Sequence, residues 1–373
     1  MADLKRLYAK TGGFMKGICH PDGDRDGLLE LGLRWVRRDI PFPFDSNGNE
    51  TEHFAAYRKA CEFYAEKGIY TVGITPYPAA FIAAGIDVHT KEGLEQAGEV
   101  CRKIAVLLKD SVKCWQVTNE MHVMHFRAPL TEEESVEFLI HCTNGLRAGD
   151  PEGCIGHNSC TPDFLPHCQR IEAETGGSDY IGLDCYAGTW GDGDTDTYGK
   201  EIQKIYDLLG LPVILMEFGY ASSGTVRNDD EAEADIREFL NARGFKDRDD
   251  AIARHEELAK FVPPVLASWA NRCSPKDKPQ YLLNSMNHIL KHWRYSGGFT
   301  HSEKGQADFY SELLPKLMAN PHLGGAVLYC WKDSSPCFTC GVDDCPCETA
   351  WGILRKDGSR KPAYGAIKKV VTE

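Results

Sequence analysis

The stretch Pro212-Val-Ile-Leu-Met-Glu217-Phe-Gly219 decides the fold class. Its apolar run is too short for a helix and is bounded by Pro and Gly, so it predicts a fully buried strand. The strand ends in a carboxylate, whose charge is costly to bury without a partner. Earlier in the chain, Cys114-Trp-Gln-Val-Thr-Asn119-Glu120 repeats this pattern. Two buried strands therefore place Glu120 and Glu217 on one rim of a parallel sheet, and paired carboxylates at a rim are the groups used in glycoside hydrolysis.

Strand-like runs alternate with amphipathic helical segments along the chain. Strands are expected at Phe14–His20, Leu33–Ile40, Ile69–Thr75, Val112–Glu120, Gly153–Cys160, Tyr180–Tyr186, Pro212–Gly219 and Gly325–Trp331. Helices are expected at Glu52–Lys67, Lys91–Lys109, Glu132–Ala148, Phe164–Glu174, Tyr198–Leu209, Ala307–Met318 and Pro362–Val371. Eight such units predict an α/β fold of the (β/α)8 TIM-barrel type. A dinucleotide fold is disfavoured, because no Gly-x-Gly-x-x-Gly follows the first strand.

The alternation is interrupted after the seventh strand. Residues 220–300 contain a charged helical segment, Asp229–Leu240, and a more apolar one, Gln280–Trp293. A loop of this length on the rim of a barrel is usually functional. We therefore expect one catalytic domain over residues 1–373, with an insertion at 220–300 that walls off the substrate cleft.

Composition excludes several classes of partner. The formal net charge of −13 argues against nucleic acid or an anionic membrane and suits a neutral substrate. The first residues contain no apolar segment, and no apolar run is long enough to cross a membrane. Of the 15 cysteines, Cys19, Cys185 and Cys330 lie singly in expected strands, as reduced cysteines do. We expect a soluble, cytoplasmic protein.

Several motifs resemble glycoside hydrolase clan A over the whole barrel. Asn119-Glu120 and Glu217 are similar to the ends of strands four and seven in that clan. Asp184-Cys-Tyr186 and Trp331 stand where the clan often has a Tyr and a Trp, and Trp351–Tyr364 is similar to its closing segment, "WG…DG…KPAY". The resemblance implies that Glu120 is the general acid/base and Glu217 the nucleophile of a retaining β-glycosidase that needs no cofactor.

Physical chemistry specifies what should surround these carboxylates. Two carboxyls about 5–5.5 Å apart, one ionised and one protonated, allow a retaining mechanism, and their mutual repulsion separates their pKa values. Arg37 or Arg38 and the Tyr186 hydroxyl are candidate partners of Glu217. Arg37 follows the clan-like "WVR" pattern better and is favoured. Asn119 is expected to bind the sugar 2-hydroxyl.

Other rim residues have both a structural and a functional interpretation. Tyr186 and Trp331 either pack in the core or contact the sugar. His20, His157 and Asn158 end strands one and five, and each is either a satisfied polar residue or a sugar ligand.

A cysteine cluster follows the eighth strand. Cys337, Cys340, Cys345 and Cys347 form C-x-x-C followed by C-x-C, which offers four thiolates to a structural zinc. Two local disulfides or free thiols are the alternatives. The acidic turn Asp192–Asp196 lacks the glutamate that an EF-hand loop requires, so we do not expect calcium there.

Taken together, these patterns predict a retaining glycoside hydrolase that cleaves β-linked glycosides or oligosaccharides. The alternatives are a non-catalytic or repurposed sugar-binding barrel, which both glutamates disfavour, and a metal-dependent barrel hydrolase. The latter lacks the expected His/Asp ligand set at the strand ends. The expected partner is a carbohydrate substrate. The sugar, the linkage and the oligomeric state are not encoded in any recognisable pattern.

Overall fold

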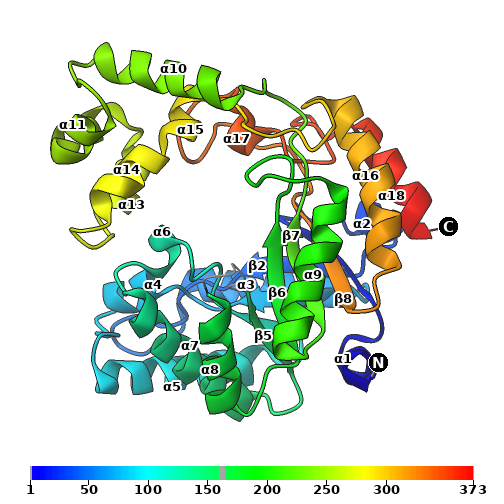
Figure 1. The fold of residues 1–373 in the computed structure, drawn as a ribbon. Coiled ribbons are helices and arrows are strands. Elements are labelled where there is room, and N and C mark those ends of the chain that lie inside the picture. Colours follow the sequence, from blue (N-terminus) through cyan, green and yellow to red (C-terminus); the bar gives the residue numbers. More distant parts are fainter. Residues whose placement is uncertain (1, 159–163, 373) are drawn as a thin grey trace. The chain divides into compact units, whose positions relative to one another are not determined.

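A computed structural model describes residues 2–158 and 164–372. Its strands are β1 (Met15–Cys19), β2 (Trp35–Asp39), β3 (Tyr70–Ile74), β4 (Val112–Val117), β5 (Cys154–Asn158), β6 (Tyr180–Cys185), β7 (Val213–Phe218) and β8 (Leu323–Leu328). They are parallel and close in chain order into one barrel (Figure 1). The predicted (β/α)8 TIM barrel is therefore confirmed. Cys160, the predicted end of the fifth strand, lies outside the described residues.

Helices follow most strands. They are α1 (Ala2–Thr11), α2 (Arg25–Glu30), α3 (Glu52–Ala65), α4 (Pro78–Ala83), α5 (Lys91–Leu108), α6 (Met124–Arg127), α7 (Glu132–Gly149), α8 (Leu165–Thr175), α9 (Thr195–Leu209), α16 (Glu303–Met318), α17 (Pro346–Thr349) and α18 (Pro362–Thr372). Seven of them (α3, α5, α7, α8, α9, α16 and α18) lie close to where the sequence predicts them, whereas α1, α2, α4, α6 and α17 were not predicted. Between β7 and α16 lie α10 (Asp229–Asn241), α11 (Arg248–Ala253), α12 (His255–Leu258), η1 (Ala259–Phe261), α13 (Pro264–Ala270), α14 (Lys278–Asn284) and α15 (Met286–Leu290). The segment predicted as a single helix, Gln280–Trp293, is thus divided between α14 and α15.

A large apolar core lies between the strands and the helices around them. On this side Trp115 of β4 and Ile155 of β5 are buried together with apolar faces of α3, α4, α5, α7 and α8. Helices α5 and α7 pack side by side, as Figure 1 shows. Gly98 and Gly145 make this possible, because a Cβ at Gly145 would collide with the carbonyl of Gly98. Burial of this layer fixes the orientation of the strands and hence of the residues at their ends.

The chain forms two compact units. The first comprises residues 1–185, 199–218 and 317–329 and contains all eight barrel strands, whereas the second comprises residues 186–198, 219–316 and 330–373. The second unit includes the whole insertion, which has its own apolar core. Members of that core include Phe239, Leu266 and Leu282. A single catalytic domain over residues 1–373 stays a prediction.

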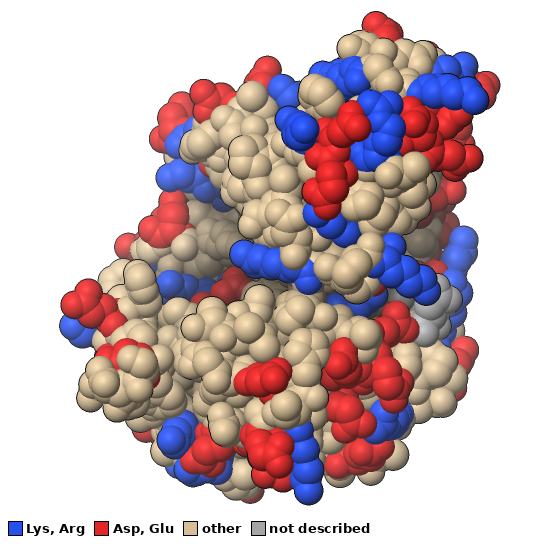
Figure 2. Space-filling view, turned by 90° about the vertical axis from the view of Figure 1, so that its left-hand side faces the viewer, with Lys and Arg blue, Asp and Glu red and all other residues tan. Residues whose placement is uncertain are grey.

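Acidic and basic side chains are interspersed on the face shown in Figure 2. On that face the net negative charge of the chain is spread out and not concentrated in one patch. Among the described residues, no helix combines the length and the apolar character needed to cross a membrane.

Candidate active site

Strand β2 presents its two arginines to different surroundings. Arg37 is buried in the barrel and contacts groups at the ends of other strands. Arg38 lies next to it in the sequence and points to α3, where its guanidinium carbon is 5.1 Å from the ring centre of Tyr57 and 5.9 Å from that of Tyr64. This alternation is the ordinary consequence of strand geometry. It places Arg37, the favoured candidate, beside the carboxylates.

The Arg37 guanidinium connects strands β2, β4 and β7. Its Nη1 lies 2.5 Å from Oε1 of Glu217, its Nη2 donates to Oδ1 of Asn119 at 2.5 Å, and its Nε donates to Oε1 of Gln116 at 2.8 Å. Burial disfavours the cation, but the acidic groups around it, Glu217 foremost, together raise the pKa of Arg37 well above its ordinary value. The planar guanidinium group of arginine carries several N–H donors in fixed directions, so it can bind several acceptors at once. A lysine ammonium group does not have this geometry.

The side-chain amide of Asn119 is held in one orientation by three donors. Arg37, Gln116 and Asn158 all donate to Oδ1, at 2.5, 3.0 and 2.6 Å. The two amides are themselves oriented, because Gln116 Oε1 accepts from Arg37 and Asn158 Oδ1 accepts from the backbone N–H of Glu120. Three donors therefore occupy the Asn119 oxygen. The Nδ2 of Asn119 faces Glu120 and lies 3.4 Å from Oε2 of that residue. This NH2 group is the donor that Asn119 offers at the rim.

Glu120 follows β4 on an unusual backbone. The φ angles of Thr118 and Glu120 are 55° and 44°, in the left-handed region that non-glycine residues rarely adopt. The Glu120 N–H is held by both the carbonyl and the side-chain oxygen of Asn158, at 3.1 and 3.0 Å. Such strain persists where surrounding bonds enforce it, and it concentrates at functional sites. Burial, and next the charge of Glu217, raise the pKa of Glu120 to about 8.

Glu217 is placed by an irregularity in β7. Leu215 pairs with Leu183 of β6, and Glu217 pairs with Asp184, so β7 carries one more residue than β6 over this interval. Bulges of this kind redirect a side chain and are common beside active sites. The Glu217 side chain is 13% exposed, whereas that of its partner Arg37 is 3% exposed. The carboxylate is therefore both ion-paired and accessible.

Asp184 is a third carboxyl in the site, and the sequence reasoning gave it no role. Its Oδ2 accepts a 2.6 Å hydrogen bond from Asn158, and its Oδ1 is a buried oxygen for which no hydrogen bond is found among the described residues. Burial, followed by the charge of Glu217, raises the pKa of Asp184 well above its usual range. Gln116 was also missed. In both cases the available signal was a polar side chain inside an otherwise apolar strand run.

The remaining sequence candidates lie in other surroundings. His157 is buried on β5, with Nε2 3.3 Å from Glu172 of α8, and is not part of the network around Arg37. His20 is exposed after β1, in edge-to-face contact with Tyr329. Tyr186 and Trp331 belong to the second unit, where their rings contact Trp351 and Tyr364. For these four predicted candidates, contact with a sugar stays a prediction.

The cysteine cluster also belongs to the second unit. Sulfur atoms of Cys337, Cys340 and Cys345 lie within 4.8 Å of one another. Cys347 falls in a second group with Cys345 and a residue that the sequence reasoning missed, His288. No single group contains all four cysteines in the described part of the chain.

Comparison with known proteins supports the fold. The sequence matches no protein-family model and no curated protein. Among solved structures, the GH53 catalytic domain of Ignisphaera aggregans matches with a TM-score of 0.60 and 14% identity, over 100% of this chain and 95% of that one. The chain has the barrel fold of glycoside hydrolases. The predicted resemblance to clan A is thus confirmed at the level of the fold.

Two further structures give the same result. A family 39 glycoside hydrolase from Bacteroides cellulosilyticus matches with a TM-score of 0.57 and 12% identity, over 97% of this chain and 64% of that one. A β-glucuronidase from an uncultured Clostridium sp. matches with a TM-score of 0.55 and 15% identity, over 96% of this chain. The chain spans only 50% of the length of that β-glucuronidase.

Proposed function

We propose that the protein is a retaining glycoside hydrolase that cleaves β-linked glycosides or oligosaccharides, with Glu217 as nucleophile and Glu120 as general acid/base. The observation that carries this proposal is the different electrostatic surroundings of the two glutamates. Glu217 is paired with the buried Arg37 at 2.5 Å, and Glu120 has its pKa raised to about 8. A carboxyl whose pKa is raised, next to a carboxylate held by a cation, supplies the acid and the nucleophile of such reactions.

In the first step a carboxylate oxygen of Glu217 bonds to the anomeric carbon as the glycosidic C–O bond breaks. Glu120 gives its proton to the departing oxygen, so the leaving group departs as a neutral alcohol. In the second step Glu120, now a carboxylate, takes a proton from water while that water attacks the anomeric carbon. The bond to Glu217 breaks, and both glutamates return to their starting states.

Asn119 has a positioning role in this proposal. Because its oxygen is occupied by three donors, only its NH2 group is free to reach the substrate. The NH2 group lies close to Glu120 and is suited to donate to the sugar 2-hydroxyl, a contact that strengthens in the transition state.

The test uses nitrophenyl glycosides with Glu217→Ala and Glu120→Ala variants. Glu217→Ala should lose turnover, and added azide should restore it by forming a glycosyl azide of inverted anomeric configuration. Glu120→Ala should retain the first step on activated phenol leaving groups and lose about 10²–10⁴-fold on alkyl glycosides. Near-normal activity of Glu217→Ala would refute the nucleophile assignment. Sugar binding without any turnover by the wild type would favour a sugar-binding barrel instead.

The substrate panel should include uronides as well as neutral sugars. Structures named as β-glucuronidase and β-galacturonidase are among the structural neighbours, beside the GH53 and family 39 enzymes. A panel of β-glucuronide, β-galacturonide, β-galactoside, β-xyloside and β-glucoside therefore separates the main possibilities in one experiment.

A further inference from the structure

The loop of residues 337–347, called here the cysteine loop, holds a preorganised group of thiols. Cys337 and Cys345 are buried, and Cys340 is half-buried. Their sulfur atoms lie within 4.8 Å of one another, and each of the three is a free thiol. The barrel core also holds neighbouring thiols in pairs, Cys101 with Cys142 and Cys114 with Cys154, but this loop brings three together.

The backbone forms a tight turn around Cys337 and Cys340. The N–H of Cys340 donates to Sγ of Cys337 at 3.3 Å. Gly341 closes the turn with φ of 76° and donates to the carbonyl of Cys337 at 2.8 Å, and Cys337 donates to the carbonyl of Val342 at 2.9 Å. A backbone N–H directed at sulfur is also found where a cysteine binds a metal, and it orients the Cys337 side chain. The positive φ makes glycine the natural residue after the second cysteine.

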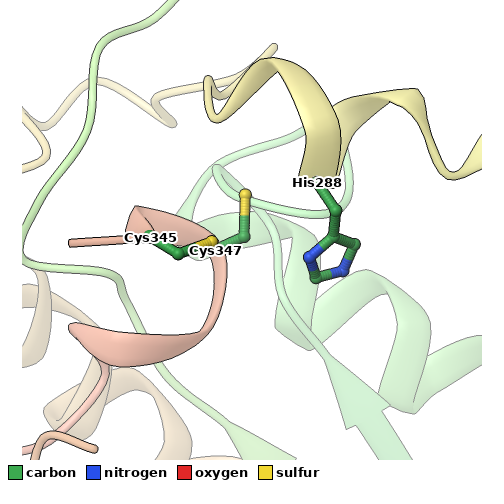
Figure 3. Close-up of side chains that lie close together, drawn as sticks. All are labelled: His288, Cys345 and Cys347. Atoms are coloured by element: carbon green, nitrogen blue, oxygen red, sulfur yellow. The ribbon is translucent and has the colours of Figure 1, made fainter. Parts of the chain in front are cut away.

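His288 of α15 approaches the same loop. It forms a second group with Cys345, which precedes α17, and with Cys347 of α17, again within 4.8 Å (Figure 3). The two groups share Cys345, and no group in the described part of the chain joins His288 to Cys337 or Cys340. The Nδ1 of His288 is buried, and no hydrogen-bond partner for it is found among the described residues. Oε1 of Glu348 lies 3.7 Å from its Nε2. A buried ring nitrogen without a partner costs free energy, which a metal bond would recover. A carboxylate near the other ring nitrogen is the usual support of a metal-bound histidine.

We propose that the second unit binds one zinc ion through the thiolates of Cys337, Cys340 and Cys345 and the imidazole of His288. Binding releases three thiol protons to solvent and leaves a closed tetrahedral centre with three sulfurs and one nitrogen, a common structural arrangement for zinc. Cys347 remains a neighbour of the centre. His288 is chosen as the fourth ligand because it lies within 4.8 Å of Cys345, the cysteine shared by the two groups, and because its Nδ1 is buried without a partner among the described residues.

The role of this centre is structural. Three thiolates select zinc over magnesium or calcium, and a centre closed by four protein ligands has no position for a substrate. The metal would join α15 of the insertion to the cysteine loop, two segments that are distant in sequence. It is independent of the proposed glycosidase chemistry.

Metal analysis of the full-length protein, purified without added zinc, tests the proposal. We expect about one zinc per chain, released on modification of the thiols. In the cobalt-substituted protein, the absorption and the X-ray fine structure should indicate a tetrahedral ion with three sulfurs and one nitrogen. His288→Ala should lower zinc affinity by more than the roughly 10–100-fold that loss of a supporting residue costs. His255→Ala and Cys273→Ser, in the same unit but outside the cluster, serve as controls and should retain wild-type zinc content.

Three results would overturn the assignment. Zinc-free native protein with titratable thiols or disulfides at these cysteines would remove the metal centre altogether. Four sulfur ligands in the cobalt spectrum would exclude His288, as would a His288→Ala variant of unchanged affinity beside a Cys347→Ser variant that lost zinc. The spectrum of the wild type decides between the ligand sets even if a variant fails to fold.

Discussion

The state of Glu120 predicts a definite pH dependence. Burial and the charge of Glu217 raise its pKa to about 8, so about nine-tenths of the enzyme would carry the acid form at pH 7 and about one-tenth at pH 9. A glutamate at its ordinary pKa would be only about 0.2% protonated at pH 7. The site therefore increases the acid form by a factor of several hundred at neutral pH. Raising the pH through 8 removes this proton and with it the acid catalyst.

The assay is kcat/KM against pH, measured in parallel on an alkyl glycoside and on a dinitrophenyl glycoside. For the alkyl glycoside, kcat/KM should fall about tenfold per pH unit above a midpoint near 8, because its leaving group needs a proton. For the dinitrophenyl glycoside, the decrease should be much smaller, since this leaving group departs unprotonated.

Glu120→Ala provides the control, because its kcat/KM on the dinitrophenyl substrate should not show the step near pH 8. Two outcomes would refute the reasoning. One is a wild-type midpoint below pH 6 on the alkyl substrate. The other is a step near pH 8 that persists in Glu120→Ala, which would assign the titration to another group.

Arg37→Lys retains the positive charge but loses the planar guanidinium donors that hold Glu217 and Asn119. The misplaced side chains should reduce kcat by about 100-fold. Arg38→Lys, one residue away, should have a kcat near that of the wild type. Asp184→Asn should shift the alkaline midpoint little, because the raised pKa of Asp184 favours its neutral form; a large downward shift would contradict this. Asp179→Asn removes a buried carboxylate that faces three cations at the other end of the barrel. Its hydrogen bonds and these cations lower the pKa of Asp179 despite burial, so the variant should lose about 1–3 kcal/mol of unfolding free energy at pH 7. Urea unfolding should show this difference above about pH 4 and its loss as the pH falls through the lowered pKa.

The barrel was predictable because its signals are local. Each strand is a short apolar run between turn residues, and each of the main helices has an amphipathic period. The two glutamates were predictable for the same reason, since a charge at the end of a buried run is conspicuous. The amphipathic helix α1 (Ala2–Thr11) was nevertheless overlooked, and the split of Gln280–Trp293 into two helices depends on packing within the insertion.

The site network depends on contacts between strands, which the sequence does not display. Nothing in the sequence indicates that Asn119 Oδ1 accepts bonds from residues of β2, β4 and β5. Successive side chains of a strand point to opposite faces, so Asn158 and His157 must face different sides of β5. This rule would have predicted that His157 faces α8. His288 was not recognised because its relation to the cysteines arises only from the fold.

The left-handed backbone at Thr118 has a consequence for engineering. A β-branched residue in this conformation stores on the order of 1–3 kcal/mol of strain. Its amide is held by the Thr75 hydroxyl at 2.9 Å, and the turn it makes delivers Asn119 and Glu120 to the rim. Searches for thermostable variants should therefore select Thr118→Gly readily. Such variants would gain resistance to heat and lose turnover, so a screen of this protein should score activity together with stability.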